Sequence, residues 1–450
     1  MRIVIIGAGE VGFHVAKALS LEDFDITVID LDPEKCRRAS EHLDVIVVQG
    51  NGASPKNLVK ADVARADYVF ALTRIDEVNL IASQQARQLG ANKVIARLRN
   101  QQYSDTNSII KPEKFGIDHV IHPEKEACKE IVRLVEHPYA TKVMDFEGGR
   151  LKMVGIRIAL NSKIVGKTVR ELNELTQEIK FGIVAVNRGS DSIVPWGDFE
   201  FEPNDMTYFI VKTKNLDRLL QLLDINGNKS TRVMIFGGEK IGYSVAEVLQ
   251  ETKSVRLIDK RRDKSEEIAA GLSDTMVINA DATDLEFLAS ENISEVCSFI
   301  AVTKDEKENI LAGMLAHQMG AKQTIIHINT TEYIPLLQNL GIGLVVSKNM
   351  STVNGITRKI YSDKTETDLI AFEDIDVDVI ELQPQTGSIV TQKPLERIDF
   401  PQDSIVGVIN HHGNLSIARG SSRITDEDTV LVFSKTKGIP KIREIFGLDE

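Results

Sequence analysis

Short runs of apolar, largely β-branched residues alternate with longer segments in which apolar residues recur at helical spacing. In the first part of the chain the apolar runs lie at 3–6, 26–29, 45–48, 68–72 and 93–96. Segments such as 11–19 and 79–89 between them have the helical pattern. Continuous apolar strands separated by helices are typical of a parallel sheet covered on both faces. The pattern therefore predicts a doubly wound α/β domain.

The same order of elements occurs a second time, with apolar runs at 232–236, 255–258, 275–278, 298–302 and 324–328. The glycine-rich segment Gly7-Ala8-Gly9-Glu10-Val11-Gly12 is matched 230 residues later by Gly237-Gly238-Glu239-Lys240-Ile241-Gly242. Thr73 pairs with Thr303, and Asn79 with Asn309, at the same offset. A constant offset over about a hundred residues indicates an internal duplication.

Each α/β region is followed by a helical segment, at 123–135 and near 350–360, and then by short strand signals. The strand signals lie at 151–158, 183–186 and 208–211, and again at 376–382, 405–409, 415–419 and 430–433. We therefore expect two tandem halves, each a Rossmann-like domain with a doubly wound parallel sheet followed by a small α+β domain. The predicted domains are 1–138, 139–224, 232–362 and 363–450, with a linker at 225–230.

Composition narrows the class of partner. The 450 residues carry a formal charge of −12, which disfavours binding to nucleic acid or to anionic lipid. No apolar stretch reaches the length of a membrane helix, and the first residues suit a buried strand better than a signal peptide. Three widely separated cysteines suggest neither a disulfide framework nor a zinc site. The expectation is a protein of the cytoplasm that reaches any membrane through a protein partner.

The spacing Gly7-x-Gly9-x-x-Gly12 stands between a predicted strand and a predicted helix, the context that dinucleotide sites require. Its glycines permit a tight turn, the approach of a pyrophosphate, and close packing of helix on strand. Asp30 ends the next strand, where a carboxylate can accept hydrogen bonds from a ribose and repel a 2′-phosphate. This favours NAD or an adenine nucleotide over NADP. A Rossmann turn without a ligand is the alternative.

Three further residues stand at the carboxyl ends of strands, where open α/β sheets bind ligands. Asn51 suits either a polar contact with the adenine side or a simple strand end, and both interpretations stay open. Thr73 is expected near the ligand. Arg97 suits a bidentate phosphate contact or, equally, a surface salt bridge.

The second glycine segment departs from this pattern. Glu239 replaces the second glycine, and its carboxylate would crowd and repel a pyrophosphate. His327 replaces Arg97, whereas Asp259 keeps the ribose acid. Weak nucleotide binding, binding of a less phosphorylated nucleotide, and a purely structural role all remain open for the second half.

The sequence does not indicate a catalytic or metal site. His411 and His412 fall in a turn beside Gly413 and Asn414 without another clustered ligand, which favours a plain hairpin loop. A Rossmann dehydrogenase is the main alternative function, but it needs a proton-transferring group near the nicotinamide. The small domains contain few histidines and lysines and no recognisable acid/base set.

The order of these motifs resembles one known family. The glycine segment, Asp30, Gly50-Asn51-Gly52 and Thr73-Arg74-Ile75-Asp76-Glu77-Val78-Asn79 precede a strand-rich small domain, and the arrangement is duplicated. This is similar to the TrkA family, the peripheral regulatory subunits of bacterial Trk-type potassium uptake systems, built from two tandem RCK (KTN) units. The resemblance covers essentially the whole chain.

The resemblance implies function and site residues. It implies a cytosolic gating ring of four chains, with eight RCK units, at the inner face of the membrane beneath a potassium-conducting membrane subunit. It implies regulation by NAD(H), or by ATP or ADP, rather than catalysis. The implied ligand contacts are Gly7, Ala8, Gly9, Glu10, Val11, Asp30, Thr73, Arg74 and Arg97, and in the second half Gly237, Gly238, Glu239, Lys240, Ile241 and Asp259. An isolated chain is expected to expose Ile131, Leu134 and Ile356, which assembly would cover.

Overall fold

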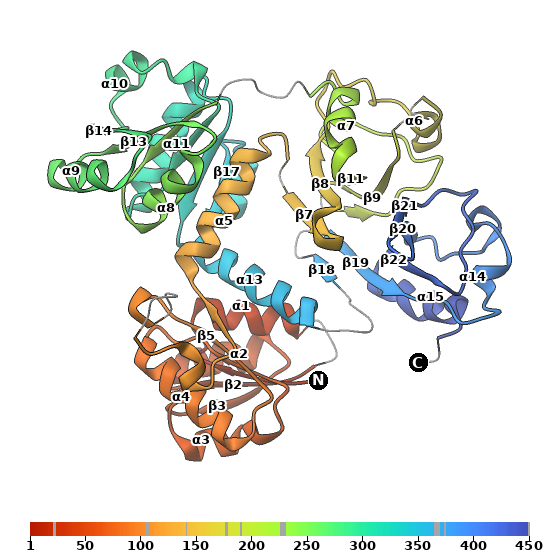
Figure 1. Ribbon diagram of the computed structural model, residues 1–450, viewed down its shortest axis with the longest axis horizontal. Coiled ribbons are helices and arrows are strands. Elements are labelled where there is room, and N and C mark those ends of the chain that lie inside the picture. Colours follow the sequence, from red (N-terminus) through yellow and green to blue (C-terminus); the bar gives the residue numbers. More distant parts are fainter. Residues whose placement is uncertain are drawn as a thin grey trace. The chain divides into compact units, whose positions relative to one another are not determined.

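The computed structural model describes residues 1–20, 24–103, 109–140, 142–175, 179–189, 191–225, 231–363, 370–372 and 375–448. The chain divides into two compact units (Figure 1). The Rossmann unit comprises Met1–Val132 and Ser230–Lys359, and the small-domain unit comprises Arg133–Lys229 and Ile360–Glu450. Each unit therefore combines one domain from each tandem half. Most of the predicted linker, residues 226–230, lies outside the described residues.

The Rossmann unit contains two six-stranded parallel sheets with the same strand order. The first sheet is ordered β3-β2-β1-β4-β5-β6 and the second β14-β13-β12-β15-β16-β17. The strands of the first are β1 (Arg2–Ile6), β2 (Asp25–Asp30), β3 (Ile46–Gln49), β4 (Tyr68–Ala71), β5 (Lys93–Arg97) and β6 (His119–Ile121). Those of the second are β12 (Arg232–Phe236), β13 (Ser254–Asp259), β14 (Thr275–Asn279), β15 (Ser298–Ala301), β16 (Thr324–Ile328) and β17 (Leu344–Ser347). The predicted fold class is confirmed, although the sequence pattern missed the last strand of each sheet.

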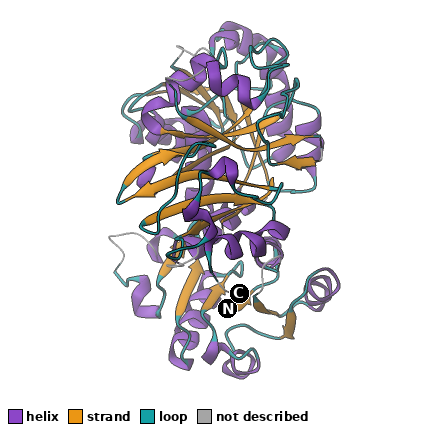
Figure 2. Ribbon diagram, turned by 90° about the vertical axis from the view of Figure 1, so that its right-hand side faces the viewer, coloured by secondary structure: helices purple, strands orange, loops and turns teal. Residues whose placement is uncertain are grey.

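Helices flank these strands, as the view coloured by secondary structure shows (Figure 2). In the first domain they are α1 (Glu10–Leu19), α2 (Pro33–His42), α3 (Pro55–Lys60) and α4 (Asp76–Leu89). In the second they are α8 (Lys240–Leu249), α9 (Arg262–Gly271), α10 (Leu285–Ser290), α11 (Glu306–Gln318) and α12 (Tyr333–Asn339). The central strands β1 and β12 are almost wholly buried beyond their first residue, which explains why they read as continuous apolar runs.

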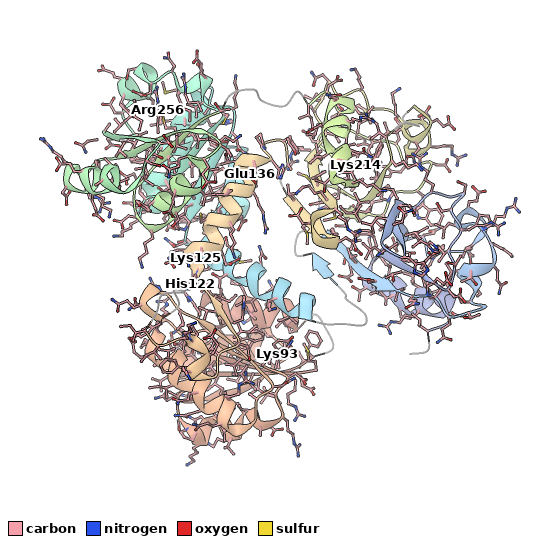
Figure 3. All side chains as sticks on the ribbon, viewed as in Figure 1. Lys93, His122, Lys125, Glu136, Lys214 and Arg256 are labelled. Atoms are coloured by element: carbon pink, nitrogen blue, oxygen red, sulfur yellow. The ribbon has the colours of Figure 1, made fainter. Side chains whose placement is uncertain are left out.

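Two long helices leave the Rossmann domains, α5 (Pro123–Glu136) and α13 (Lys348–Asp363). Figure 3 shows His122 and Lys125 where α5 begins. The two helices contact each other, since the Ser351 hydroxyl donates a hydrogen bond to a Glu130 carboxylate oxygen. Ile131 and Ile356 are fully buried and Leu134 is 8% exposed. The expectation that an isolated chain exposes these three residues is therefore wrong, because the chain covers them itself.

The small-domain unit contains two five-stranded antiparallel sheets, ordered β10-β9-β11-β8-β7 and β18-β19-β22-β20-β21. Their strands are β7 (Lys142–Phe146), β8 (Leu151–Arg157), β9 (Phe181–Arg188), β10 (Asp191–Ile193), β11 (Met206–Lys212), β18 (Ile370–Phe372), β19 (Ile375–Leu382), β20 (Ser404–His411), β21 (Asn414–Ile417) and β22 (Asp428–Ser434). Their helices are α6 (Val169–Leu175), α7 (Leu216–Leu222), α14 (Ile389–Gln392) and α15 (Ile439–Phe446).

The two small domains share a hydrophobic core. Met153 and Val184 of the first belong to the same buried cluster as Val379 and Phe433 of the second. A hydrogen bond also joins the two domains, since Trp196 Nε1 donates to the carbonyl oxygen of Gln402 at 2.7 Å. The duplicated halves are thus paired within one chain. Among the described residues, no helix has both the length and the apolar character needed to cross a membrane.

Candidate functional site

The first glycine segment forms a tight loop between β1 and α1. Gly7 has a φ of +107°, a conformation that favours glycine. A Cβ on Gly12 would lie 1.8 Å from the Gly7 carbonyl oxygen, so the third glycine is needed for packing. A Cβ on Gly9 would meet no atom within 4 Å. The loop therefore leaves open space beside Gly9, where the sequence predicts the pyrophosphate.

A cleft of about 410 Å³ opens beside this loop at the carboxyl edge of the first sheet. Its volume is in the range of small-molecule sites in proteins. The sequence-predicted residues that line it are Gly7, Gly9, Glu10, Val11, Asp30, Asn51, Thr73, Arg74 and Arg97. Ala8, buried in the loop, and Gly12, buried in the first turn of α1, are not among its lining residues. We call this cavity the first cleft.

The Asp30 carboxylate holds the glycine loop in place. One of its oxygens accepts a hydrogen bond of 2.6 Å from the Ala8 amide, and the other one of 2.9 Å from the Asp32 amide. Because each carboxylate oxygen has two lone pairs, Asp30 keeps acceptor capacity toward the cleft. The predicted ribose contact is compatible with this second, structural role.

Thr73 lines the first cleft, but its hydroxyl is already engaged. It donates to Asn79 Oδ1 at 2.7 Å, and the Thr73 amide donates to the same oxygen at 2.9 Å. Asn79 is fully buried and also donates to the Arg97 carbonyl oxygen at 2.8 Å. The repeat reproduces these backbone bonds, since Asn309 accepts from the Thr303 amide at 2.8 Å and donates to the His327 carbonyl at 3.0 Å. This clamp ties adjacent strand ends together in both domains.

Asn51 also combines a structural contact with a position on the cleft. Its Oδ1 atom accepts a hydrogen bond of 2.9 Å from the Ala53 amide. Asp281 forms the equivalent bond of 2.8 Å with the Thr283 amide in the second domain. These bonds account for a polar residue at the strand end, and a contact between Asn51 and a ligand stays a prediction.

Among the residues that line the first cleft, Arg97 is the one that most directly indicates an anionic ligand. It is only 7% exposed, and within the described part of the chain its Nε atom has no hydrogen-bond partner and it forms no salt bridge. Burial, together with the nearby charge of Arg99, lowers the pKa of its guanidinium. A buried cation of this kind is costly unless an anion joins it. The salt bridge considered as an alternative is not found among the described residues.

A residue from the other half of the chain also lines the first cleft, which no sequence motif had indicated. Asn349, near the start of α13, lines the first cleft. The adjacent Lys348 is mostly buried, 3.8 Å from a Glu124 oxygen, and lies close enough to Arg97 and Arg99 to feel their charges. Burial, with those two arginines, lowers the pKa of the Lys348 ammonium. Arg97, Arg99 and Lys348 therefore bring positive charge to this region, which the carboxylates of Glu124 and Asp76 offset in part.

The equivalent cleft of the second domain is smaller, about 200 Å³, and contains a network of ion pairs. A Glu239 carboxylate oxygen lies 2.7 Å from Arg261 Nη1 and 2.8 Å from Lys304 Nζ. Arg261 also donates to both oxygens of Asp259, at 3.0 and 2.9 Å. The acid predicted to hold a ribose is thus covered by an arginine of the same chain. We call this cavity the second cleft.

The cations of this network lower the pKa values of both of its carboxylates. Hydrogen bonds from Lys304 and then Arg261 hold the pKa of Glu239 below its usual range. Burial raises the pKa of Asp259, but hydrogen bonds from Arg261 and Gly238 outweigh it and leave the pKa lowered. Both carboxylates are therefore ionised at neutral pH and paired with cations. Of the other predicted contacts, Gly237 lines the second cleft, whereas Gly238, Lys240 and Ile241 are not among its lining residues.

His327 does not replace the function of Arg97. It is 4% exposed, and both ring nitrogens lack a hydrogen-bond partner in the described structure. Burial lowers its pKa to about 4. The imidazole is therefore neutral at physiological pH, so it supplies no positive charge for a phosphate.

Comparison with known families agrees with the duplicated architecture. The model of the TrkA-N domain matches residues 3–123 and again 233–348, and the model of the TrkA-C domain matches residues 153–224. The chain belongs to the TrkA family. The Trk system potassium uptake protein TrkA homolog 2 of Methanosarcina mazei is 32% identical over 99% of this chain and 100% of its own length. A TrkA homolog of Archaeoglobus fulgidus is 34% identical over 99% of the chain and 100% of its own length.

Solved structures support the fold of this TrkA-family chain. The RCK domain of GsuK aligns with a TM-score of 0.59 at 16% identity, covering 99% of this chain and 95% of that one. The GsuK channel bound to NAD aligns with a TM-score of 0.60 at 15% identity, covering 99% of this chain and 79% of that one. At such identities the likeness concerns the fold.

Proposed function

We propose that this chain is a nucleotide-sensing regulatory subunit of a potassium uptake system, with its ligand in the first cleft. The observation that carries the proposal is the buried guanidinium of Arg97 beside an open glycine loop. A pyrophosphate placed there would meet backbone amides, the amino terminus of α1 and this arginine. NAD(H) fits best, because Asp30 favours a free ribose 2′-hydroxyl, and ATP or ADP shares the same adenosine and phosphate chemistry.

The relatives support both parts of this proposal. The curated relatives that match along nearly the whole chain are named Trk system potassium uptake proteins. A channel with the same fold has been solved bound to NAD. The expected partner is an integral membrane subunit that conducts potassium, and the expected location is the cytoplasmic side of the membrane.

The residues of the first cleft suit binding better than hydride transfer. Among the described residues that line it, the ionisable side chains are Glu10, Asp30, Lys35, Arg74 and Arg97. No histidine, cysteine or tyrosine is among them. The acids and the lysine that could transfer a proton are already paired, since Glu10 lies 3.0 Å from Arg38, Lys35 lies 3.3 Å from Asp32, and Asp30 accepts from the Ala8 amide. A dehydrogenase of Rossmann type remains the alternative, to be distinguished by assaying turnover.

A ligand in the first cleft would also connect the two halves of the chain. Asn349 belongs to α13 of the second half and lines this cleft, and the adjacent Lys348 lies close enough to Arg97 to feel its charge. An anion there would offset the mutual repulsion of Arg97, Arg99 and Lys348 and so favour the arrangement with α13 close by. A ligand that stabilises one arrangement over another shifts the population, which is how nucleotide binding would change the regulator's shape.

The first test is binding without turnover. Titration of the purified chain with NAD⁺, NADH, ATP and ADP by calorimetry should detect tight binding of at least one of them. Incubation with NAD⁺ and a panel of hydroxy acids and amino acids should give no NADH absorbance at enzymatic rates. Steady NADH production with any of these substrates would favour the dehydrogenase instead.

The second test concerns assembly. Exposed apolar side chains occupy equivalent positions on α4 and α11, with Ile81 46% and Leu311 48% exposed. Such faces suit contacts between chains, and closed symmetry is the usual result. Light scattering should give about four chains of 49.9 kDa, roughly 200 kDa in all. Ile81→Asp combined with Leu311→Asp should reduce this mass, whereas a wild-type protein that stays at one chain at every concentration would contradict the ring.

A further inference from the structure

The hairpin between β20 and β21 brings two imidazoles next to two carboxylates that are distant in sequence. His411 ends β20 and pairs in register with Asp428, the first residue of β22. His412 follows in the turn with a φ of +48°, and its ring centroid lies 4.6 Å from that of His411. The sequence favoured a plain loop because the possible partners, Glu427 and Asp428, lie 15–17 residues further along the chain.

The side chains form two close pairs, and three of them bring possible metal ligands near one another. His411 Nδ1 lies 2.7 Å from Asp428 Oδ1, and His412 Nε2 lies 3.1 Å from Glu427 Oε2. One ligand atom from each of His411, His412 and Glu427 lies within 4.8 Å of the others. Ligands of a single tetrahedral zinc ion lie about 3.4 Å from one another, given bonds of roughly 2.1 Å. Because all three residues are exposed, rotation of their side chains would bring these atoms to that spacing.

We propose that this cluster binds a divalent transition-metal ion of the Zn²⁺ class. Two imidazoles and one carboxylate form a donor set that Zn²⁺ and related ions prefer, with water completing the coordination. Asp428 acts on His411 as a supporting carboxylate, because a bond to Nδ1 leaves Nε2 available to a metal. Asp428 is itself fixed, being 3% exposed and accepting a bond of 2.7 Å from the Thr425 amide.

The repeat offers a simpler explanation for one of these contacts. In the first small domain, Arg188 binds the buried Asp205 through two hydrogen bonds of 2.9 and 2.8 Å. His411 stands in the same relation to Asp428, so it serves partly as the partner of a buried acid. That role does not account for His412 and Glu427, nor for the second nitrogen of His411. The proposed metal site gives a role to these three groups, namely His412, Glu427 and Nε2 of His411.

A metal ion at this site would stabilise the contact between the two small domains. Within the small-domain unit, Arg150 Nη1 donates a hydrogen bond of 2.9 Å to the Gly413 carbonyl oxygen in the same turn. The charge of Arg150 is offset by Glu147, 2.8 Å away. Glu427 and Asp428 therefore give the turn a local surplus of negative charge, which attracts a cation. Metal binding would hold the turn, and with it the contact to the first small domain.

The proposal is tested by titrating the chelator-treated full chain with Zn²⁺ by calorimetry. We expect one ion per chain and a higher midpoint of thermal unfolding in its presence. His412→Asn and Glu427→Gln should each weaken this binding at least tenfold. Asparagine is chosen at position 412 because it tolerates the left-handed conformation there. His317→Asn, which removes an exposed histidine on α11, is the matched control and should bind Zn²⁺ normally.

Two results would overturn the metal site. One is the absence of stoichiometric Zn²⁺ binding by the wild-type chain, and the other is binding that is unchanged in both His412→Asn and Glu427→Gln. These variants leave the buried Asp428 and its His411 contact in place, so the test does not depend on a variant that fails to fold. Nucleotide affinity at the first cleft should be the same in His412→Asn and wild type, which separates this site from the proposed function.

Discussion

Replacing Gly9 with glutamate is expected to remove most of the nucleotide binding by the chain, lowering its affinity at least tenfold. The new carboxylate would stand at the amino terminus of α1, where the phosphates would otherwise bind backbone amides. Loss of one charge-assisted hydrogen bond costs about 1.5–3 kcal/mol, and each 1.4 kcal/mol is a factor of ten. Repulsion between the carboxylate and the phosphates adds to this loss. Calorimetry with NAD⁺ or NADH measures the effect.

The Gly9→Glu variant should fold normally. Gly9 has a φ of −69° and a ψ of −176°, which any residue can adopt, and no atom lies within 4 Å of a Cβ there. Glu239 stands at the equivalent place with a φ of −75° and a ψ of −172°, so the same loop already accommodates a glutamate. Glu239→Ala is the matched control and should keep the tight site. If the tight site instead survives in Gly9→Glu and is lost on changing Gly237 or Asp259, the ligand binds in the second cleft.

The duplication and the parallel sheets were predictable because they depend on local patterns. Buried strands such as β1 read as unbroken apolar runs, and a constant offset of 230 exposes the repeat. The strand β6 was missed because it spans only three residues and has only two consecutive apolar side chains. The strand β17 has three consecutive apolar residues in four, as β3 does, so its pattern offered a signal that was not used. The pairing of α5 with α13 was also missed. An apolar helix face shows that it will be buried, but not whether its partner is the same chain or another.

The candidate site was predictable only in part. Residues in and beside the glycine loop were found because their spacing itself encodes the turn. Asn349 was missed, because only the folded chain brings α13 to the first cleft. The structural role of Asn79 had a usable signal: the second half retains both Thr303 and Asn309 although its glycine segment is altered. Because the threonine and the asparagine are retained where the glycine segment is altered, they are expected to hold the strands rather than the ligand.

The ion pairs of the second cleft could not be predicted from the spacing of residues in the sequence. Glu239 was expected to repel a pyrophosphate, yet its partners Arg261 and Lys304 come from two other loops, after β13 and β15. Arg261 occupies the residue before α9, where the first domain has Asp32 before α2. Asp32 caps α2 in the first domain, whereas Arg261 at the corresponding place of the second domain contacts Asp259 and Glu239. The charged groups of the second cleft are thereby paired with one another, and we infer that this cleft does not bind a nucleotide in the wild-type chain.

Restoring the residues of the first domain should therefore open the second cleft. In a chain carrying Glu239→Gly together with Arg261→Asp, Asp259 regains free acceptor oxygens and the amino terminus of α8 loses its carboxylate. Lys304 is 78% exposed and would remain to attract a phosphate, the role proposed for Arg74, which lines the first cleft at the matching position. We expect calorimetry to show two nucleotides bound per chain in this variant and one in wild type. The new site should be the weaker, because the neutral His327 cannot replace Arg97.

Single changes and a neighbouring control make this prediction specific. Glu239→Gly alone leaves Arg261 bound to Asp259, so the ribose acid stays covered and little second-site binding is expected. Arg262→Asp alters the adjacent residue, whose guanidinium contacts only the exposed Glu266 among the described side chains, and should leave the stoichiometry at one. Circular dichroism checks that each variant is folded. A wild-type chain that already binds two nucleotides with equal affinity, or a folded double variant that still binds only one, would show that the ion pairs do not close the cleft.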